Sequence, residues 1–288
     1  MKKITTSIVS LGLLLALMPA PSVANNATEW QQRLTELSES RSRGEAHLQR
    51  NQYRHPVETL MFFGIEPQMS VLEIWPVRGW YTEILAPFLK DEGQLTIAHF
   101  RLDGGNNADE KSVFWTRLTN RLEQRILQQE ATFGQVSRVA LDPPNFIPQL
   151  AADQFDMVLS FRNVHIWDQA GHLRATLENM FRVLKPGGIL GMVEHRAAKV
   201  TELTSYAVEG YTDEAYLIAV AEAIGFHLID RSEVNANAKD TKDYVKGVYT
   251  LPPTLALGQE DRDFYQNIGE SDRMTLKFIK PQDVDSVD

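Results

Sequence analysis

Four polar side chains lie at or just beyond the ends of two apolar segments of this chain, and two of them are histidines that could accept a proton. Asn163 and His165 come shortly after the segment FDMVLSF, and Glu194 and His195 end the segment GILGMVEH. Histidine titrates near neutral pH, so His165 or His195 could remove a proton from a substrate hydroxyl or amine. Asn163 and Glu194 could position that histidine. The alternative is that all four residues only hydrogen-bond neighbouring loops together.

The same two histidines and Glu194 are also chemically able to bind a metal ion. Sequence support for such a site would be a short ligand spacing such as HExxH. No spacing of that kind includes His165 or His195. We therefore predict that the chain has no metal site.

A second group of candidate residues lies in VLEIWPVRGWYTEIL, residues 71–85. This segment indicates a buried strand with the acidic residue Glu73, a tight turn that contains Arg78 and Gly79, and the start of a helix. Backbone amides of such a turn, together with a helix N-terminus, can hold a nucleotide-like ligand. The turn has a single glycine, however, and Val77 adds bulk and disfavours the positive φ that glycine permits.

The elements that would position these residues alternate between strand and helix patterns beyond residue 70. This alternation is typical of βαβ units and predicts an α/β fold with a largely parallel sheet. The predicted strands are 70–75, 94–100, 137–142, 155–161, 188–195, 226–234 and 274–281. The last of them alternates and is polar enough to be an antiparallel partner. Since ligands bind outside the carboxyl ends of such strands, the turn and the histidines are expected at one edge.

The first 24 residues are typical of a secretory signal peptide. Lys2 and Lys3 precede an apolar run, and Ser22 and Ala24 form an A-x-A-like cleavage site. The apolar run is shorter than the ~20 residues that a spanning helix needs, so we expect cleavage, a periplasmic location and no stable membrane anchor. The predicted organisation is a helical N-terminal extension at 25–66, followed by one α/β domain at 67–288 in which 235–273 form an inserted cover segment.

Composition limits the possible partners. The chain has 288 residues, no cysteine and a formal net charge of −9, which becomes −11 when the two lysines of the signal peptide are removed. An acidic protein is a poor binder of phosphate backbones, so nucleic acid is not expected as a partner. Without cysteine, no disulfide can form, and the hydrophobic core alone must stabilise the exported protein. The sequence indicates no particular oligomeric state.

Five segments carry a resemblance that covers nearly the whole mature chain. They are VLEIWPVRGWYTEILAP, QFDMVLSFRNVHIW, MFRVLKPGGILGMVEHRA, the helix before AIGFHLI, and IGESDRMTLKFIKP. In this order they resemble the successive motifs of class I S-adenosylmethionine (SAM)-dependent methyltransferases, and more narrowly a group of exported bacterial predicted methyltransferases. The resemblance implies a Rossmann-like seven-stranded sheet with helices on both faces and an antiparallel last strand. It also implies SAM as the cofactor.

The resemblance implies roles for individual residues. Glu73 would orient the methionine amino group of SAM, and Asp142 would lie near the adenine amino group. Arg78, Gly79 and Phe161 would complete the cofactor site.

The sequence also departs from the family. The turn is glycine-poor, and the acidic residue usual at the end of the second strand is replaced by His99 and Phe100. The string DPPN at 142–145 resembles the Asp-Pro-Pro-aromatic motif of amino-methylating enzymes, but it precedes the fourth strand and lacks the aromatic residue, so we interpret it as a turn.

The leading prediction is SAM-dependent methyl transfer to a small molecule, with at most one general base. Tyr244, Tyr249 and Tyr265 of the cover segment could line its substrate pocket, or could simply bury that segment. The competing prediction is a binding protein that keeps the fold and has lost or altered its cofactor site. The glycine-poor turn and export to a compartment without an evident supply of SAM favour this alternative.

Overall fold

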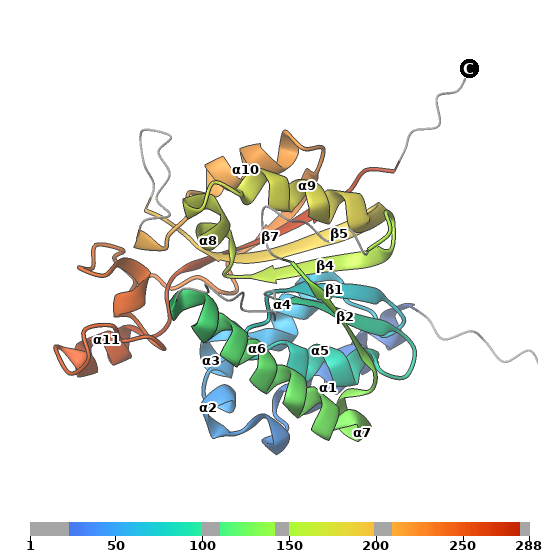
Figure 1. Ribbon diagram of the computed structural model, residues 1–288, viewed down its shortest axis with the longest axis horizontal. Helices are drawn as coiled ribbons and strands as arrows, with labels where there is room; N and C mark the ends of the chain where they lie inside the picture. Colours follow the sequence, from blue (N-terminus) through green and yellow to red (C-terminus); the bar gives the residue numbers. More distant parts are fainter. Residues whose placement is uncertain (1–22, 100–109, 142–149, 199–208, 283–288) are drawn as a thin grey trace, which may run out of the picture.

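A seven-stranded sheet forms the centre of the protein (Figure 1). The computed structural model describes residues 23–99, 110–141, 150–198 and 209–282. Residues 1–22, Asp142 and the rest of DPPN therefore lie outside the described residues. The strands are β1 (Ser70–Ile74), β2 (Gln94–His99), β3 (Val136–Ala140), β4 (Phe155–Phe161), β5 (Leu184–His195), β6 (His227–Ser232) and β7 (Arg273–Ile279).

The strand order is β3-β2-β1-β4-β5-β7-β6. Strands β1 to β5 are parallel, and β7 runs antiparallel to both β5 and β6. This order confirms the predicted fold class, including the antiparallel last strand. Successive strands are added toward one edge of the sheet from β1 to β3 and toward the other edge from β4 onward. Open α/β sheets bind ligands outside the strand ends at such a switch point, which here lies between β1 and β4.

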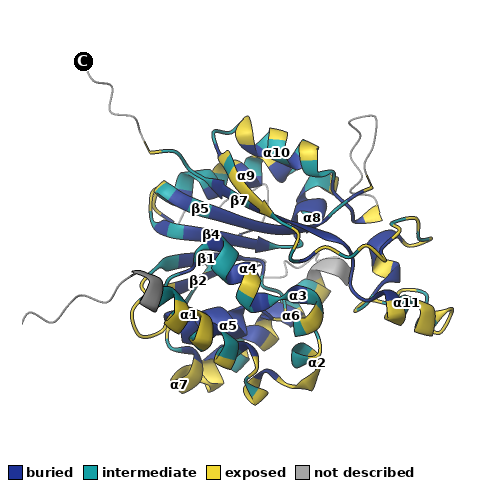
Figure 2. Ribbon diagram, turned by 180° about the vertical axis from the view of Figure 1, so that it is seen from behind, coloured by how far each residue is buried: buried dark blue, intermediate teal, exposed yellow. Residues whose placement is uncertain are grey.

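Helices cover both faces of the sheet (Figure 1). One face carries α8 (Val164–Gln169), α9 (Leu173–Val183) and α10 (Glu214–Glu222); the other carries α1 (Val23–Ser38), α4 (Pro56–Phe63), α5 (Thr82–Leu89), α6 (Glu110–Gln128) and α7 (Glu130–Phe133). In α9 the buried residues recur every three or four positions, as in Leu173, Leu177 and Met180, so one helix face packs on the sheet. Buried residues are concentrated along the sheet and on the inner helix faces (Figure 2).

The N-terminal helices are joined to α5 by a buried charge cluster. Besides α1 and α4, this region contains η1 (Arg41–Arg43), α2 (Glu45–Leu48) and α3 (Asn51–Arg54). Glu83 of α5 accepts a hydrogen bond from Arg43 Nε at 3.3 Å and lies 2.9 Å from His47 Nδ1, and Arg125 of α6 also contacts it. Because Arg43 and Glu83 are buried together, the extension is fixed against the domain.

The connection between β6 and β7 is long and contains η3 (Gly247–Thr250) and α11 (Arg262–Ile268). It returns the chain so that β7 begins beside the carboxyl end of β5, where His195 pairs with Arg273. Within the described part of the chain, no helix combines the length and apolar character needed to cross a bilayer.

Candidate active site

The turn after β1 has left-handed backbone at three alternate residues. The φ angles of Trp75, Val77 and Gly79 are 43°, 56° and 73°. Glycine normally occupies such positions, so this turn keeps the backbone course of a glycine-rich turn with only one glycine. Val77 thus adopts the positive φ that its β-branched side chain disfavours. Hydrogen bonds from Trp75 N to Ala98 O (2.7 Å) and from Gly79 N to Pro76 O (2.8 Å) hold the conformation.

Gly79 is required by packing as well as by its backbone angle. A Cβ atom at this position would lie 2.4 Å from Leu122 Cδ1 of α6. Arg78, in contrast, is exposed. The indole of Trp75 turns away from solvent, donates from Nε1 to Leu141 O at 2.9 Å and packs against Trp167.

Val77→Gly is expected to stabilise the protein by about 1 kcal/mol. A β-branched residue at positive φ costs roughly 1–3 kcal/mol, and glycine removes that strain at an entropic cost of roughly 0.5–1 kcal/mol. Arg78 lies outside the left-handed region, so Arg78→Gly incurs only the entropic cost and is the matched control. Urea denaturation of both variants tests this; a less stable Val77→Gly protein would contradict it.

Glu73 is buried directly beneath this turn. Its side chain is 1% exposed and accepts a hydrogen bond from Thr82 Oγ1 at 2.6 Å. Burial raises the pKa of Glu73 to about 8, the Thr82 hydrogen bond opposes this shift, and the nearby Glu83 charge adds to it. A cationic group at this position would favour the ionised carboxylate. The chemistry of Glu73 therefore fits the amino group of a bound methionine moiety.

Phe161, at the end of β4, lies beside the turn. Its ring stacks on Tyr81 with centroids 3.6 Å apart and an interplanar angle of 9°. Asn163 follows in the same loop and donates from Nδ2 to Ile74 O at 2.9 Å. Asn163 thus ties the end of β4 to the end of β1, which fixes the switch point.

Glu194 organises the two histidines. Its carboxylate is fully buried and accepts hydrogen bonds from Val164 N at 2.6 Å and His195 N at 2.8 Å. His165 Nδ1 lies 2.9 Å from the same carboxylate. A carboxylate can only accept, so the His165 proton lies on Nδ1 and the lone pair on Nε2 is available for a substrate proton.

His195 has a different environment. Burial lowers its pKa well below the usual value, and the charges of His165 and Arg162 act in the same direction. Its Nδ1 forms a hydrogen bond with Ser271 Oγ, and its ring centroid lies 5.3 Å from that of His165. His195 is therefore neutral at pH 7 and a weak base, which favours His165 as the general base.

The side chains of His165, Glu194 and His195 place one ligand atom each within 4.8 Å of one another. Their surroundings are unfavourable for a cation, because Arg162, Arg273 and Arg54 all lower the pKa of His195. The same positive charges would repel a divalent ion. The absence of a resident metal stays our prediction.

The cover segment reaches this site at one tyrosine. The ring of Tyr249 lies 6.3 Å from that of His165. Tyr244 and Tyr265 instead pack against each other at 5.9 Å. Of the three tyrosines considered from the sequence, Tyr249 is the one adjacent to the histidines.

A family model described as a methyltransferase domain matches residues 120–192, from α6 into β5. This match agrees with the strand order, which is that of the Rossmann-like methyltransferase fold. Glu73 and the turn precede the matched residues, whereas Phe161, Asn163 and His165 lie within them. A search of curated proteins finds no match.

Solved structures similar to this chain share little sequence with it. The [4+2]-cyclase SpnF has a TM-score of 0.54 at 15% identity, over 80% of each chain. A SAM-dependent methyltransferase from Aquifex aeolicus has a TM-score of 0.49 at 18% identity, over 71% of this chain and 93% of that chain. N-methyltransferase NodS from Bradyrhizobium japonicum WM9 has a TM-score of 0.49 at 17% identity, over 83% and 99%. The cyclase match supports the fold alone, and its name shows that the fold also accommodates other reactions.

Sequence reasoning missed four residues that lie at this edge of the sheet. Trp75 was not expected to have positive φ, and Arg54, Arg162 and Arg273 were not singled out. The arginines come from α3, from the loop after β4 and from the start of β7. No local pattern links them, because only the folded sheet and its N-terminal helices bring them together.

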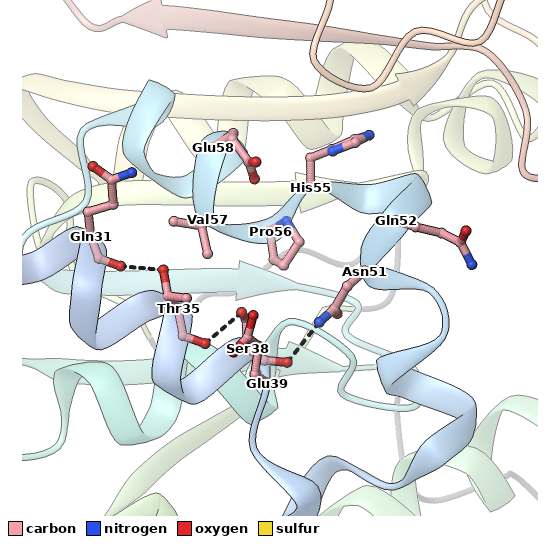
Figure 3. A pocket seen from close by; sticks show the side chains of 10 residues that line it. All are labelled: Gln31, Thr35, Ser38, Glu39, Asn51, Gln52, His55, Pro56, Val57 and Glu58. Carbon is pink, nitrogen blue, oxygen red and sulfur yellow. Dashed lines mark hydrogen bonds between the residues drawn. The ribbon is translucent and has the colours of Figure 1, made fainter.

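A surface pocket of about 310 Å³ lies among the N-terminal helices, between α1, α3 and α4 (Figure 3). Polar residues such as Thr35, Asn51 and Glu58 line it. None of its lining residues belongs to the turn or to the histidine site, so it has no part in the chemistry considered below.

Proposed function

We propose that this protein transfers the methyl group of SAM to a small molecule. The observation that carries the proposal is the buried Glu73 carboxyl beneath a turn with positive φ at residues 75, 77 and 79. This arrangement lies at the switch point of the sheet, where Asn163 ties the end of β1 to the loop that leads to His165. A cationic methionine amino group would give Glu73 the charge partner that it lacks.

Each residue has a defined task in this proposal. Bound SAM supplies an electrophilic methyl group on its sulfonium. Glu73 holds the amino group of the cofactor, and the turn backbone with Phe161 and Tyr81 forms the adjacent wall. His165, oriented by Glu194, accepts the proton of the acceptor hydroxyl or amine at Nε2. Alignment of the acceptor supplies most of the rate enhancement.

Calorimetric titration of the protein that begins at Asn25 tests this proposal. We expect SAM and its demethylated product S-adenosylhomocysteine to bind with Kd values in the micromolar range. Weak or absent binding of both compounds by a folded protein would overturn the enzymatic function.

The competing function is binding of another ligand by the same fold. The side chain of Val77 in the glycine-poor turn favours it, because this side chain adds bulk where glycine would leave space for a cofactor. If the wild type binds no SAM and Val77→Gly restores binding, the cofactor site has decayed.

Asp142 lies outside the described residues, and we propose that it contacts the adenine of SAM. Asp142→Asn tests this contact and is expected to lower SAM affinity tenfold or more.

We also propose that the protein acts in the periplasm. Lys2, Lys3 and the following apolar run support export, and Ser22 and Ala24 support cleavage after residue 24. N-terminal sequencing of the protein from a periplasmic fraction should begin at Asn25. Recovery of an uncleaved chain from membranes would contradict this location.

A further inference from the structure

Four arginines gather around one buried glutamate beside the histidine site. Glu270 Oε1 lies 2.5 Å from Arg50 Nε, and its Oε2 accepts from Arg54 Nε and Arg273 Nη1, both at 3.1 Å. Arg162 is close enough for its charge to act on this glutamate. We refer to Arg50, Arg54, Arg162 and Arg273 as the arginine cluster.

The arginine cluster has unused hydrogen-bond donors. Arg54 and Arg273 are 2% and 3% exposed, yet Arg54 Nη2 and Arg273 Nε are buried without a partner among the described residues, as is Arg50 Nη2. The Arg162 guanidinium also has no hydrogen-bond or ion-pair partner within the described ranges. Leaving buried charged donors unpaired is costly, and a ligand with acceptor oxygens would satisfy the three buried donor atoms.

The charges of the cluster are not balanced. Although burial opposes it, Arg54, Arg273 and Arg50 hold the pKa of Glu270 below its usual range, so this carboxylate is ionised. Glu270 neutralises one of the four guanidiniums, and Glu194 already accepts three hydrogen bonds of its own. Burial together with the charge of Arg162 lowers the pKa of Arg54 well below its usual value. An additional anion would relieve this excess of positive charge.

The cluster adjoins the proposed base. Ser271 follows Glu270 in the chain and hydrogen-bonds His195 Nδ1, and the His195 ring lies 5.3 Å from that of His165. Arg162 begins the loop that carries His165, and its backbone N donates to Val193 O at 2.7 Å. A ligand that reaches the arginines therefore extends toward both imidazoles.

We propose that the arginine cluster binds an oxyanion of the methyl acceptor, so that the acceptor is an acidic small molecule with a carboxylate or phosphoryl group. Guanidinium N–H groups bind such oxyanions in a directed, charge-assisted geometry. The bound oxyanion would place a neighbouring hydroxyl or amine of the acceptor at His165. This inference rests on the proposed methyl transfer for the identity of the ligand as acceptor. The carboxylate of SAM is the other possible source of the same chemistry.

Arg162→Gln tests the site, because the Arg162 side chain makes no described hydrogen bond that folding would lose. The probes are inorganic phosphate and acetate, titrated without SAM and followed by calorimetry and thermal unfolding. We expect wild type to bind at least one probe with a millimolar Kd, and Arg162→Gln to weaken that binding about tenfold. Arg162→Lys, which keeps the charge, should bind with intermediate affinity. Arg174→Gln is the matched control, because Arg174 is exposed on α9 and loses the same charge.

The second arm measures the SAM affinity of the same proteins. We expect Arg162→Gln to bind SAM within twofold of wild type. A tenfold loss of SAM affinity would instead assign the cluster to the cofactor carboxylate and overturn the proposal. Absence of probe binding in wild type, or equal probe binding in wild type and Arg162→Gln, would also overturn it. If the probes bind as expected and SAM does not bind at all, the proposed methyl transfer is contradicted, whereas the oxyanion site is supported.

Discussion

Glu73→Gln is expected to stabilise the ligand-free protein by about 5 kcal/mol at pH 9 and by less than about 1 kcal/mol at pH 5. The folded-state pKa of Glu73 is about 8, above the ordinary value of 4.5. A raised carboxyl pKa means that the folded state binds the proton more tightly. The contribution of Glu73 to the free energy of unfolding is therefore fully present below about pH 4.5, declines as the pH rises and is lost as the pH passes about 8. Glutamine has no proton to lose, so the variant lacks this decline.

Urea denaturation at pH 5, 7 and 9 measures this difference. Glu178→Gln is the control, because Glu178 is an exposed carboxylate on α9 whose one ion pair among the described residues is with Arg174. It should leave the pH dependence unchanged. Parallel pH profiles for wild type and Glu73→Gln would show that Glu73 is ionised in the folded protein.

The same substitution should weaken SAM binding by about 10- to 100-fold, because it removes a charge-assisted hydrogen bond to the cofactor amino group. Ionisation of Glu73 on binding also releases a proton from wild type near pH 7. Titrations in two buffers of different ionisation enthalpy should detect about one proton per SAM in wild type and none in Glu73→Gln. Equal proton release by both proteins would rule out Glu73 as the partner of the amino group.

Glu194→Gln is expected to destabilise the protein by about 3–5 kcal/mol. The wild-type carboxylate accepts from two backbone N–H groups and from His165. An amide in its place brings N–H donors toward these donors, and buried groups lose their partners. Denaturation measures the effect, and Glu178→Gln should change stability by less than about 0.5 kcal/mol.

Nitrogen NMR of the His165 ring distinguishes whether Glu194 orients this imidazole or only stabilises the fold. In wild type the proton should be on Nδ1, facing Glu194. In Glu194→Gln we expect a mixture of tautomers or a shift of the proton to Nε2. An unchanged tautomer in a destabilised variant would show that Glu194 stabilises the fold without orienting the base.

The order of elements was predictable from the sequence because each strand and helix has its own local pattern. The segment 155–161 is mostly apolar, with Asp156 and Ser160 as its polar residues, and its predicted bounds coincide with β4. The start of β5 was placed at 188, whereas the strand begins at Leu184. The chain continues through Lys185 and Gly188 as strand because Phe155 pairs with Leu184 across a register irregularity. Because proline and glycine are uncommon inside strands, the sequence pattern did not indicate this pairing.

The candidate site was predictable only where its residues end strands. His165, Glu194 and His195 were expected at one edge, and the structure brings them together. The backbone at Trp75 is held by a hydrogen bond to Ala98 of β2, and Gly79 packs against Leu122 of α6. No local sequence preference reveals these contacts. The arginine cluster joins residues more than 200 positions apart and has no sequence signal at all.

The pairing of Arg50 with Glu270 spans 220 positions of the chain. Contacts of such sequence separation carry a large loop-closure entropy and form slowly. The helices that precede the sheet and the segment that precedes β7 must both be in place before Arg50 and Glu270 can pair. Assembly of the arginine cluster therefore requires residues far apart in the chain: a growing chain that has not yet released Glu270 and Arg273 carries both histidines but lacks the central carboxylate of the cluster.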